Sequence, residues 1–372
     1  MAPRASDEIR PTLLREVVWN TWRRHRLALF AMAAVFAGDA IVLLFTGLHA
    51  HAVHDSFLAH RCLTVWNSLC PQLLNHMGNS TWVLGYLPWL IAVFLGAPIA
   101  AREFDTGTFR FANTQGVSAR RQLAFTLVIL AAVVMAASAM LGLLGMWCQD
   151  PFLRAGAASA SLSRWQPGYF QITAVTLPGW TLFALCLGLL AGTCIKRVVP
   201  AMAIAVAGLA VFASLSTGSA ELTGWSRGGA PPQHVTLMHW LLSMSPAAKR
   251  GHTLQVGFPL GTFRHASDRT FLWPAGQSGP EESWQVGGWL AGPSGQRLSG
   301  AQTRATLGQI PLHVATKFSG VGGWLAARHI TYWIGYQPAS RYWPFQAAVA
   351  AILLALAIGA GSGAVWLVGR RR

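Results

Sequence analysis

Six long apolar runs set the strongest limit on what this chain can fold into. Each run holds roughly 20 or more mainly apolar residues, about the length that a helix needs to cross the hydrocarbon core of a membrane. The runs cover residues 27–46, 83–101, 123–147, 169–195, 198–215 and 345–368. They predict an all-α membrane protein with six transmembrane helices.

The composition favours a membrane protein over a soluble nucleic-acid-binding domain. Of the 372 residues, 53% are hydrophobic and 11% are charged, whereas an average soluble domain is about one-quarter charged. The formal net charge of +16 would favour nucleic acid if the basic residues formed a stripe on a soluble domain. They lie instead mainly at the ends of the apolar runs. We therefore expect the lipid bilayer as a partner and no nucleic acid.

The basic residues also predict the sidedness of the chain, because short cytoplasmic connections carry an excess of Lys and Arg. With the N-terminus inside, the cytoplasmic segments hold fifteen Lys or Arg and the short outer segments hold three. The long outer connection, residues 216–344, holds ten, but long loops cross the membrane largely regardless of charge. Both termini are thus predicted to be cytoplasmic.

Residues 1–26 precede the first apolar run and form a segment of their own. Their apolar residues fall near one helical face, which predicts an amphipathic helix in the cytoplasmic interface of the membrane. A solvated N-terminal extension is the alternative. Because the segment is polar through Arg26, no cleavable signal peptide is expected.

Residues 216–344 are predicted to form a small mixed extracellular subdomain between the fifth and sixth helices. The segment is rich in Gly, Pro and Trp and has short alternating stretches typical of strands. A carbohydrate-binding or lipid-binding platform is one interpretation of its tryptophans, and plain packing is the other. Residues 27–215 would carry helices one to five, and residues 345–372 the sixth helix and a basic cytoplasmic tail.

Asp39 is the one acidic residue well inside a predicted span. A carboxylate facing the lipid tails would cost several kcal/mol, so this side chain is expected to face protein or water. It either lines a translocation path or contacts another subunit, or it is protonated or bonded locally beside Gly38.

Five cysteines are too few for a disulfide scaffold and show no metal-ligand spacing, so no metal site is expected. Cys62 and Cys70 share the first outer loop, where a disulfide between them is predicted in an oxidising compartment. Cys148 is an alternative partner for this bridge. Cys186 and Cys194 lie in or near the membrane and are expected to be packing thiols.

The three lysines exclude one class of enzyme. An ATPase needs a glycine-rich loop that ends in Gly-Lys-Ser/Thr, and Lys196, Lys249 and Lys317 follow other residues. The chain is therefore not expected to be an enzyme or to bind a cofactor by itself. Any ATP-driven work would require ATP and Mg on a partner subunit.

A charged connection between the second and third spans is the most unusual stretch of the chain. The run APIAAREFDTGTFRFANTQGVSARRQ leaves one apolar span at Arg102 and reaches the next after Arg121. A second polar turn, CIKRVVP, separates the fourth and fifth spans. Such charges can make charge-assisted bonds to a soluble partner, or they can serve only as topology anchors.

The first of these stretches resembles the motif around the second span of ATP-binding-cassette type-2 export permeases, in a branch frequent in high-GC actinobacteria. The residues that carry the resemblance are Gly96, Pro98, Arg102, Glu103, Gly107, Thr108, Gln115, Ser118 and Arg120. The tail YQPASRYWPFQ, residues 336–346, is similar to the same branch, and the six-span plan matches over the whole chain. Arginine outnumbers lysine 25 to 3, which suits a high-GC bacterium and a multi-pass protein of its cell membrane.

The resemblance implies a membrane-spanning permease subunit of an ATP-driven exporter. It would pair with a second permease subunit, as a homodimer or a heterodimer, and with two copies of a cytoplasmic ATPase. The segment between the second and third spans would be a coupling helix that docks on the ATPase, with a smaller contact from the turn after the fourth span. The residues assigned to coupling are Arg102, Glu103, Asp105, Gly107, Thr108, Gln115, Ser118, Arg120, Arg121, Lys196 and Arg197.

A membrane sensor or resistance-associated binding protein is the rival interpretation. Its outer domain would capture a peptide or lipid, and its cytoplasmic segments would signal to a partner.

Overall fold

The chain forms two compact units, which we call the helical unit and the mixed unit. The helical unit comprises Met1–Pro151, Gly168–Ala213 and Gln346–Arg372, and the mixed unit comprises Phe152–Pro167 and Ser214–Phe345. The computed structural model describes residues 9–59, 83–105, 119–155, 164, 167–217, 254–258, 260–264, 270–274, 284–311, 314, 324–337 and 339–370.

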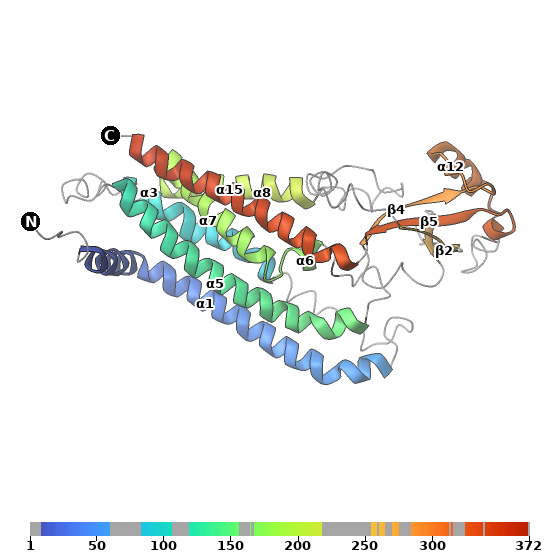
Figure 1. The fold of residues 1–372 in the computed structure, drawn as a ribbon, viewed down its shortest axis with the longest axis horizontal. Coiled ribbons are helices and arrows are strands. Elements are labelled where there is room, and N and C mark those ends of the chain that lie inside the picture. The colour runs from blue at the N-terminus through green and yellow to red at the C-terminus, as the bar shows by residue number, and fades with distance from the viewer. Residues whose placement is uncertain are drawn as a thin grey trace, which may run out of the picture. The chain divides into compact units, whose positions relative to one another are not determined.

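Long apolar helices build the helical unit, and Figure 1 shows them running alongside one another. They are α1 (Ile9–Ala59), a second helix formed by residues 83–90, η1 (Ile91–Gly96) and α3 (Ala97–Asp105), then α5 (Ala119–Ala155), α7 (Thr176–Ile195), α8 (Val198–Thr217) and α15 (Tyr342–Arg370). In the described part of the chain, five helices are long and apolar enough to cross a membrane; the apolar part of α8, Val198–Ser214, is shorter.

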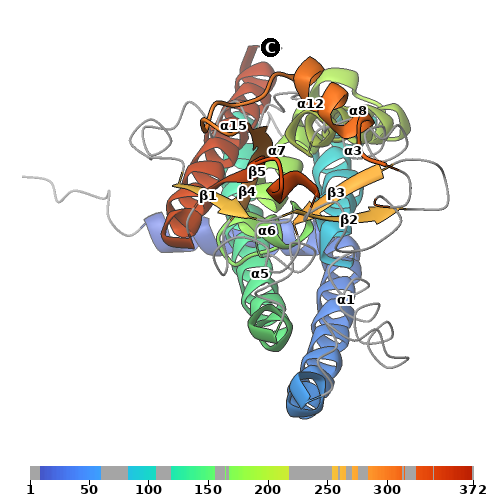
Figure 2. The ribbon, with the colours of Figure 1, turned by 90° about the vertical axis from the view of Figure 1, so that its right-hand side faces the viewer.

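Helix α1 starts well before the first predicted span. Its backbone is helical without a break from Ile9 to Ala59, so the N-terminal segment and the first span form one element. In Figure 1 the first, dark-blue turns of α1 are seen nearly end-on, whereas the rest of the helix lies across the view. The change of direction is also visible in Figure 2. Placement of the first turns in the membrane interface stays a prediction.

The fourth predicted span is wrong at its start. Instead of one helix over 169–195, the structure has the short helix α6 (Pro167–Phe170), a turn, and then α7 from Thr176. Buried side chains stabilise the break: the Thr173 hydroxyl accepts from the Thr176 N–H at 3.2 Å, as a helix cap does. The Gln346 amide donates to the Phe170 carbonyl at 2.9 Å and accepts from the Thr173 hydroxyl at 2.8 Å.

Replacing Gln346 with Leu should therefore destabilise the helical unit by about 2 kcal/mol. The change removes a donor from a buried carbonyl and an acceptor from a buried hydroxyl, and such losses cost about 1–3 kcal/mol. The check is the free energy of unfolding in detergent, compared with Leu354→Ala on the exposed face of the same helix. Equal stability of the two variants would show that the bonds at the break contribute nothing.

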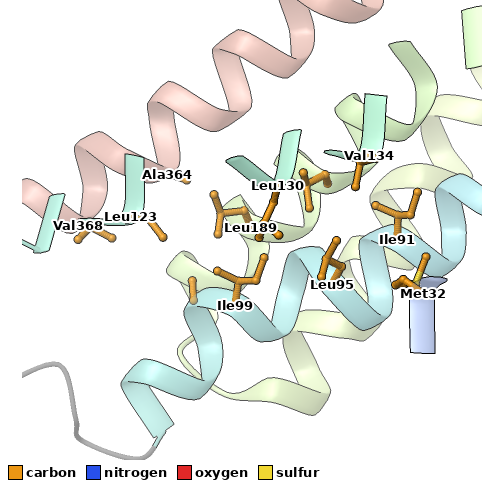
Figure 3. Packing of buried hydrophobic residues seen from close by; sticks show 12 residues of the cluster. Met32, Ile91, Leu95, Ile99, Leu123, Leu130, Val134, Leu189, Ala364 and Val368 are labelled. Atoms are coloured by element: carbon orange, nitrogen blue, oxygen red, sulfur yellow. The ribbon is translucent and has the colours of Figure 1, made fainter. Parts of the chain in front are cut away.

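The core of the helical unit lies where α5, α7, α15 and the second helix meet. The buried apolar side chains of these helices are closely packed, so a substitution that changes the volume of one of them should destabilise the unit. Figure 3 shows the cluster, and its labelled members are Met32, Ile91, Leu95, Ile99, Leu123, Leu130, Val134, Leu189, Ala364 and Val368. Helices α1, α5 and α15 keep large exposed apolar side chains that can face lipid, whereas most side chains of α7 are buried.

The mixed unit contains two antiparallel sheets and a helix. Strands β1 (Leu254–Phe258), β5 (Thr331–Gln337) and β4 (Trp284–Ala291) form one sheet in that order, and β2 (Leu260–Arg264) pairs with β3 (Thr270–Pro274). Helix α12 (Gly300–Gly308) begins at a capping box between Ser299 and Gln302. The extracellular location of the mixed unit stays a prediction.

A small hydrophobic cluster holds α12 against strand β4. Leu290 and Leu325 are fully buried, and Leu307 and Ile310 pack against them. A bulge between Gln285 and Gly287 shifts the register of β4 on β5. Residues 284–290 of the alternating stretch SWQVGGWL lie in strand β4, in agreement with their alternating pattern.

Candidate functional site

The connections that are rich in Lys and Arg lie at one end of the helical unit. Figure 1 shows the end of α3, the start of α5 and the C-terminal end of α15 at the same side of this unit. The described basic side chains of the candidate coupling residues are all exposed: Arg102, Arg120, Arg121, Lys196 and Arg197. We call this side the basic end.

The connection between the second helix and α5 falls mainly outside the described residues. Helix α3 ends at Asp105 and α5 starts at Ala119, so the connection joins two helices at the basic end. Gly107, Thr108, Gln115 and Ser118 lie outside the described residues, as do the side chains of Glu103 and Asp105. Their role in coupling stays a prediction.

The turn between α7 and α8 has an unusual backbone at Lys196. Its φ of 61° and ψ of 2° place it in the left-handed region, and its N–H donates to the Gly192 carbonyl at 3.1 Å. Glycine is the usual residue at this position after a helix, because a side chain costs about 1–2 kcal/mol there. The chain instead presents two exposed cations, Lys196 and Arg197, on a tight turn.

Glycines bring α7 and the second helix into backbone contact. A Cβ added to Gly188 would lie 2.5 Å from the Ala92 carbonyl oxygen, and one added to Gly192 would lie 2.4 Å from the Ala97 carbonyl oxygen. On the facing helix, a Cβ at Gly96 would lie 2.7 Å from the Leu185 carbonyl oxygen. We call these three residues the glycine seam. No larger residue fits there without moving a backbone.

The second helix widens where the glycine seam crosses it. Residues Ile91–Gly96 form a π-helix, in which the Ala97 N–H bonds the Ala92 carbonyl. Pro98 follows directly, and a proline inside a helix lacks its N–H and clashes with the carbonyl four residues earlier. A wide turn at this position accommodates the proline. Gly188 packs against the same turn, at the Ala92 oxygen and the Ala97 nitrogen.

The glycine seam therefore joins the two helices that lead to the two cytoplasmic connections predicted from the sequence. The second helix leads into residues 106–118 through α3, and α7 leads into the turn at Lys196. Small buried residues, including Ala97, Ala101 and Ala184, fill the contact around the seam. Along the seam the backbones of the two helices are in direct contact.

Asp39 faces protein, as the sequence predicted. It is 8% exposed and lies on the face of α1 that also buries Met32 and Leu43. Its Oδ2 atom has no hydrogen-bond partner in the described structure. A buried carboxyl group of this kind is costly inside a membrane and marks a functional candidate.

The predicted disulfide between Cys62 and Cys70 lies outside the described residues. Within the part that the structure describes, Cys148 and Cys186 are buried and Cys194 is exposed. The described residues contain no group of three or more His, Cys, Asp or Glu side chains that could hold a metal ion.

The glycine seam was missed in the sequence, although a signal for it was present. Gly188 and Gly192 form a G-x-x-x-G pattern inside an apolar helix, which is typical of close helix packing in membranes. Gly96 belongs to the stretch that resembles the permease motif, and that resemblance does not indicate a close helix contact. The left-handed conformation of Lys196 had no comparable signal.

The comparison with protein families identifies the class to which this fold belongs. Residues 22–218, just over half of the chain, match the family described as ABC-2 membrane transporter related. The chain belongs to this family and is a multi-pass membrane protein of the ABC-2 permease type. No curated protein and no solved structure matched the chain. The family favours transport and does not favour the sensor interpretation.

Proposed function

We propose that this chain is the membrane-spanning permease subunit of an ATP-driven exporter in a bacterial cell membrane. Two copies of a separate cytoplasmic ATPase would hydrolyse ATP with Mg, and a second permease subunit, the same or related, would complete the transporter. The family match supports a transport role. The observation that carries the coupling mechanism is the glycine seam.

Coupling follows from the way the seam links the basic end to the membrane helices. Closure of the ATPases would push on residues 102–121 and on the turn at Lys196. Because Gly188 and Gly192 hold α7 against the second helix at backbone distance, both helices would move as one body. Shifts of packed helices by whole steps are a common form of such transitions. Asp39, on the buried face of α1, is our candidate for a residue along the translocation path.

The proposal includes six membrane crossings, with helix α8 as the fifth. Its described apolar part has 17 residues, close to the lower end of the range of about 17–25 for a crossing. The whole helix has 20 residues. With both termini in the cytoplasm, the mixed unit would lie outside the cell.

Cysteine labelling in intact cells should confirm this sidedness. Single cysteines at Ser118 and Gly279, in a chain with its native cysteines replaced, should react with a membrane-impermeant thiol reagent only at Gly279. The reason is the excess of basic residues in the segment that contains Ser118. Permeabilised cells provide the control, because both sites should then react. Labelling of Ser118 in intact cells would contradict the orientation.

The proposed function is tested by purifying the chain from its native membrane together with its partners. We expect an ATP-binding-cassette ATPase to co-purify, and the complex in liposomes to hydrolyse ATP. The isolated chain should show no hydrolysis, because it lacks the phosphate-binding loop. Recovery of a histidine kinase in place of an ATPase would contradict the transport proposal.

A further inference from the structure

We propose that the basic ends of α5 and α15 form a binding site for the headgroup of an anionic phospholipid. The site comprises Arg120, Trp366, Gly369 and Arg370, and we call it the lipid site. It shares Arg120 with the proposed coupling segment, but it is built on α5 and α15 and does not include the two helices joined by the glycine seam. Nothing in the family match assigns it.

Helix α15 contributes an arginine and a tryptophan from one face. The Arg370 guanidinium lies 4.8 Å from the centre of the Trp366 ring, a distance typical of a cation–π contact. Trp366 is 50% exposed and lies near the end of the apolar membrane helix. Tryptophan is enriched at the level of lipid headgroups, where its ring meets the acyl boundary and its N–H meets polar groups.

Helix α5 contributes Arg120. Its side chain packs against α15 at Gly369. The Cδ atom of Arg120 lies 3.1 Å from the position that a Cβ of Gly369 would take. The absence of a side chain at Gly369 thus lets the stem of Arg120 lie on the backbone of α15, at the residue that precedes Arg370 in the chain. The Arg120 side chain is exposed, so its charged group is available to a ligand.

Charge complementarity selects an anion as the ligand. The ionisable side chains that the structure describes at the exposed ends of α5 and α15 are basic: Arg120, Arg121 and Arg370. Guanidinium groups bind phosphate through paired, charge-assisted hydrogen bonds.

The apolar part of the site selects a lipid over a soluble anion. Trp366 lies one helical turn further into the membrane helix than Arg370, and its exposed ring offers apolar area next to the charge. A phospholipid matches both features, because its phosphate lies directly above its acyl chains. A soluble phosphate would use the arginines alone.

The test measures how much phosphatidylglycerol the purified full chain retains, by native mass spectrometry from mixed micelles. The double variant Arg120→Gln/Arg370→Gln should lower retention by about tenfold or more, because it removes two arginines that can each make a charge-assisted contact. Trp366→Ala should lower it as well. The matched control is Arg328→Gln, which removes an arginine stacked 3.6 Å over Trp324 in the mixed unit and should leave retention unchanged.

Three further arms can overturn the proposal. Phosphatidylcholine should be retained equally by wild type and variant, because its net charge is zero; an equal loss of both lipids would mean that the variant is misfolded or that charge is not recognised. Displacement of the lipid by millimolar inorganic phosphate would assign the site to a soluble anion. Unchanged lipid retention with lowered recovery of the ATPase would assign Arg120 to the partner subunit instead.

Discussion

Replacing Gly188 with alanine is expected to abolish transport and to destabilise the helical unit by about 3 kcal/mol or more. The first added carbon would lie 2.5 Å from the Ala92 carbonyl oxygen and 2.9 Å from the Ala97 nitrogen. Both are backbone atoms of a packed helix, so no change of side-chain rotamer relieves the clash. Overpacking of ordinary cores costs about 1–3 kcal/mol, and backbone contacts leave less room for adjustment.

The matched control is Gly359→Ala on helix α15. Apart from its chain neighbours and the backbone of its own helix, no described atom lies within 4 Å of a Cβ added there, and the residue is exposed on an apolar membrane helix. We expect wild-type stability and transport from this variant. The measurements are the midpoint of thermal unfolding in detergent and ATP-driven transport in liposomes. A Gly188→Ala protein that unfolds and transports like the Gly359→Ala protein would show that the seam is not a tight contact.

Replacing Lys196 with glycine should stabilise the chain and weaken its binding to the ATPase. Glycine removes the cost of a side chain in the left-handed region, about 1–2 kcal/mol, so the free energy of unfolding should rise. The same change removes an exposed cation from the turn. A charge-assisted contact is worth about 1.5–3 kcal/mol, so affinity for the ATPase should fall by about tenfold or more.

The opposite signs of the two effects make this variant informative. Loss of ATPase binding through misfolding would be accompanied by lower stability, whereas loss of a contact would be accompanied by higher stability. Lys196→Arg keeps the charge and the backbone strain, and should keep the affinity. The measurements are unfolding in detergent and recovery of the ATPase at equal membrane abundance. Full recovery by Lys196→Gly would show that the turn makes no energetic contact with the partner.

Apolar length predicted most of the membrane helices, because crossing a bilayer demands it. It failed at 169–195, where Thr173 and Gln346 stabilise a break in the helix. Gln346 lies 173 residues from Thr173 in the chain, so no local pattern reveals their contact. The π-helix at Ile91–Gly96 was also hidden, since its residues would suit an ordinary helix equally well.

The charges of the candidate site were visible in the sequence, but their arrangement was not. The resemblance to the permease family assigns Arg120 to coupling, and the structure adds that its stem packs against Gly369 of α15. That contact depends on two helices meeting at their ends, which spacing along one chain does not encode. The left-handed backbone at Lys196 likewise depends on how closely α8 must follow α7.

The most direct measurement is photo-crosslinking from the connection between the second helix and α5. A photoreactive amino acid placed at Gln115 should form an adduct with the ATPase in membranes, and one placed at Gly279 in the mixed unit should not. The two variant proteins are compared at equal abundance in the membrane, so the Gly279 variant controls for unspecific capture. An ATPase adduct from Gln115 alone is the result we predict. Absence of that adduct in membranes that contain the ATPase, or equal adducts from both sites, would contradict coupling through this connection.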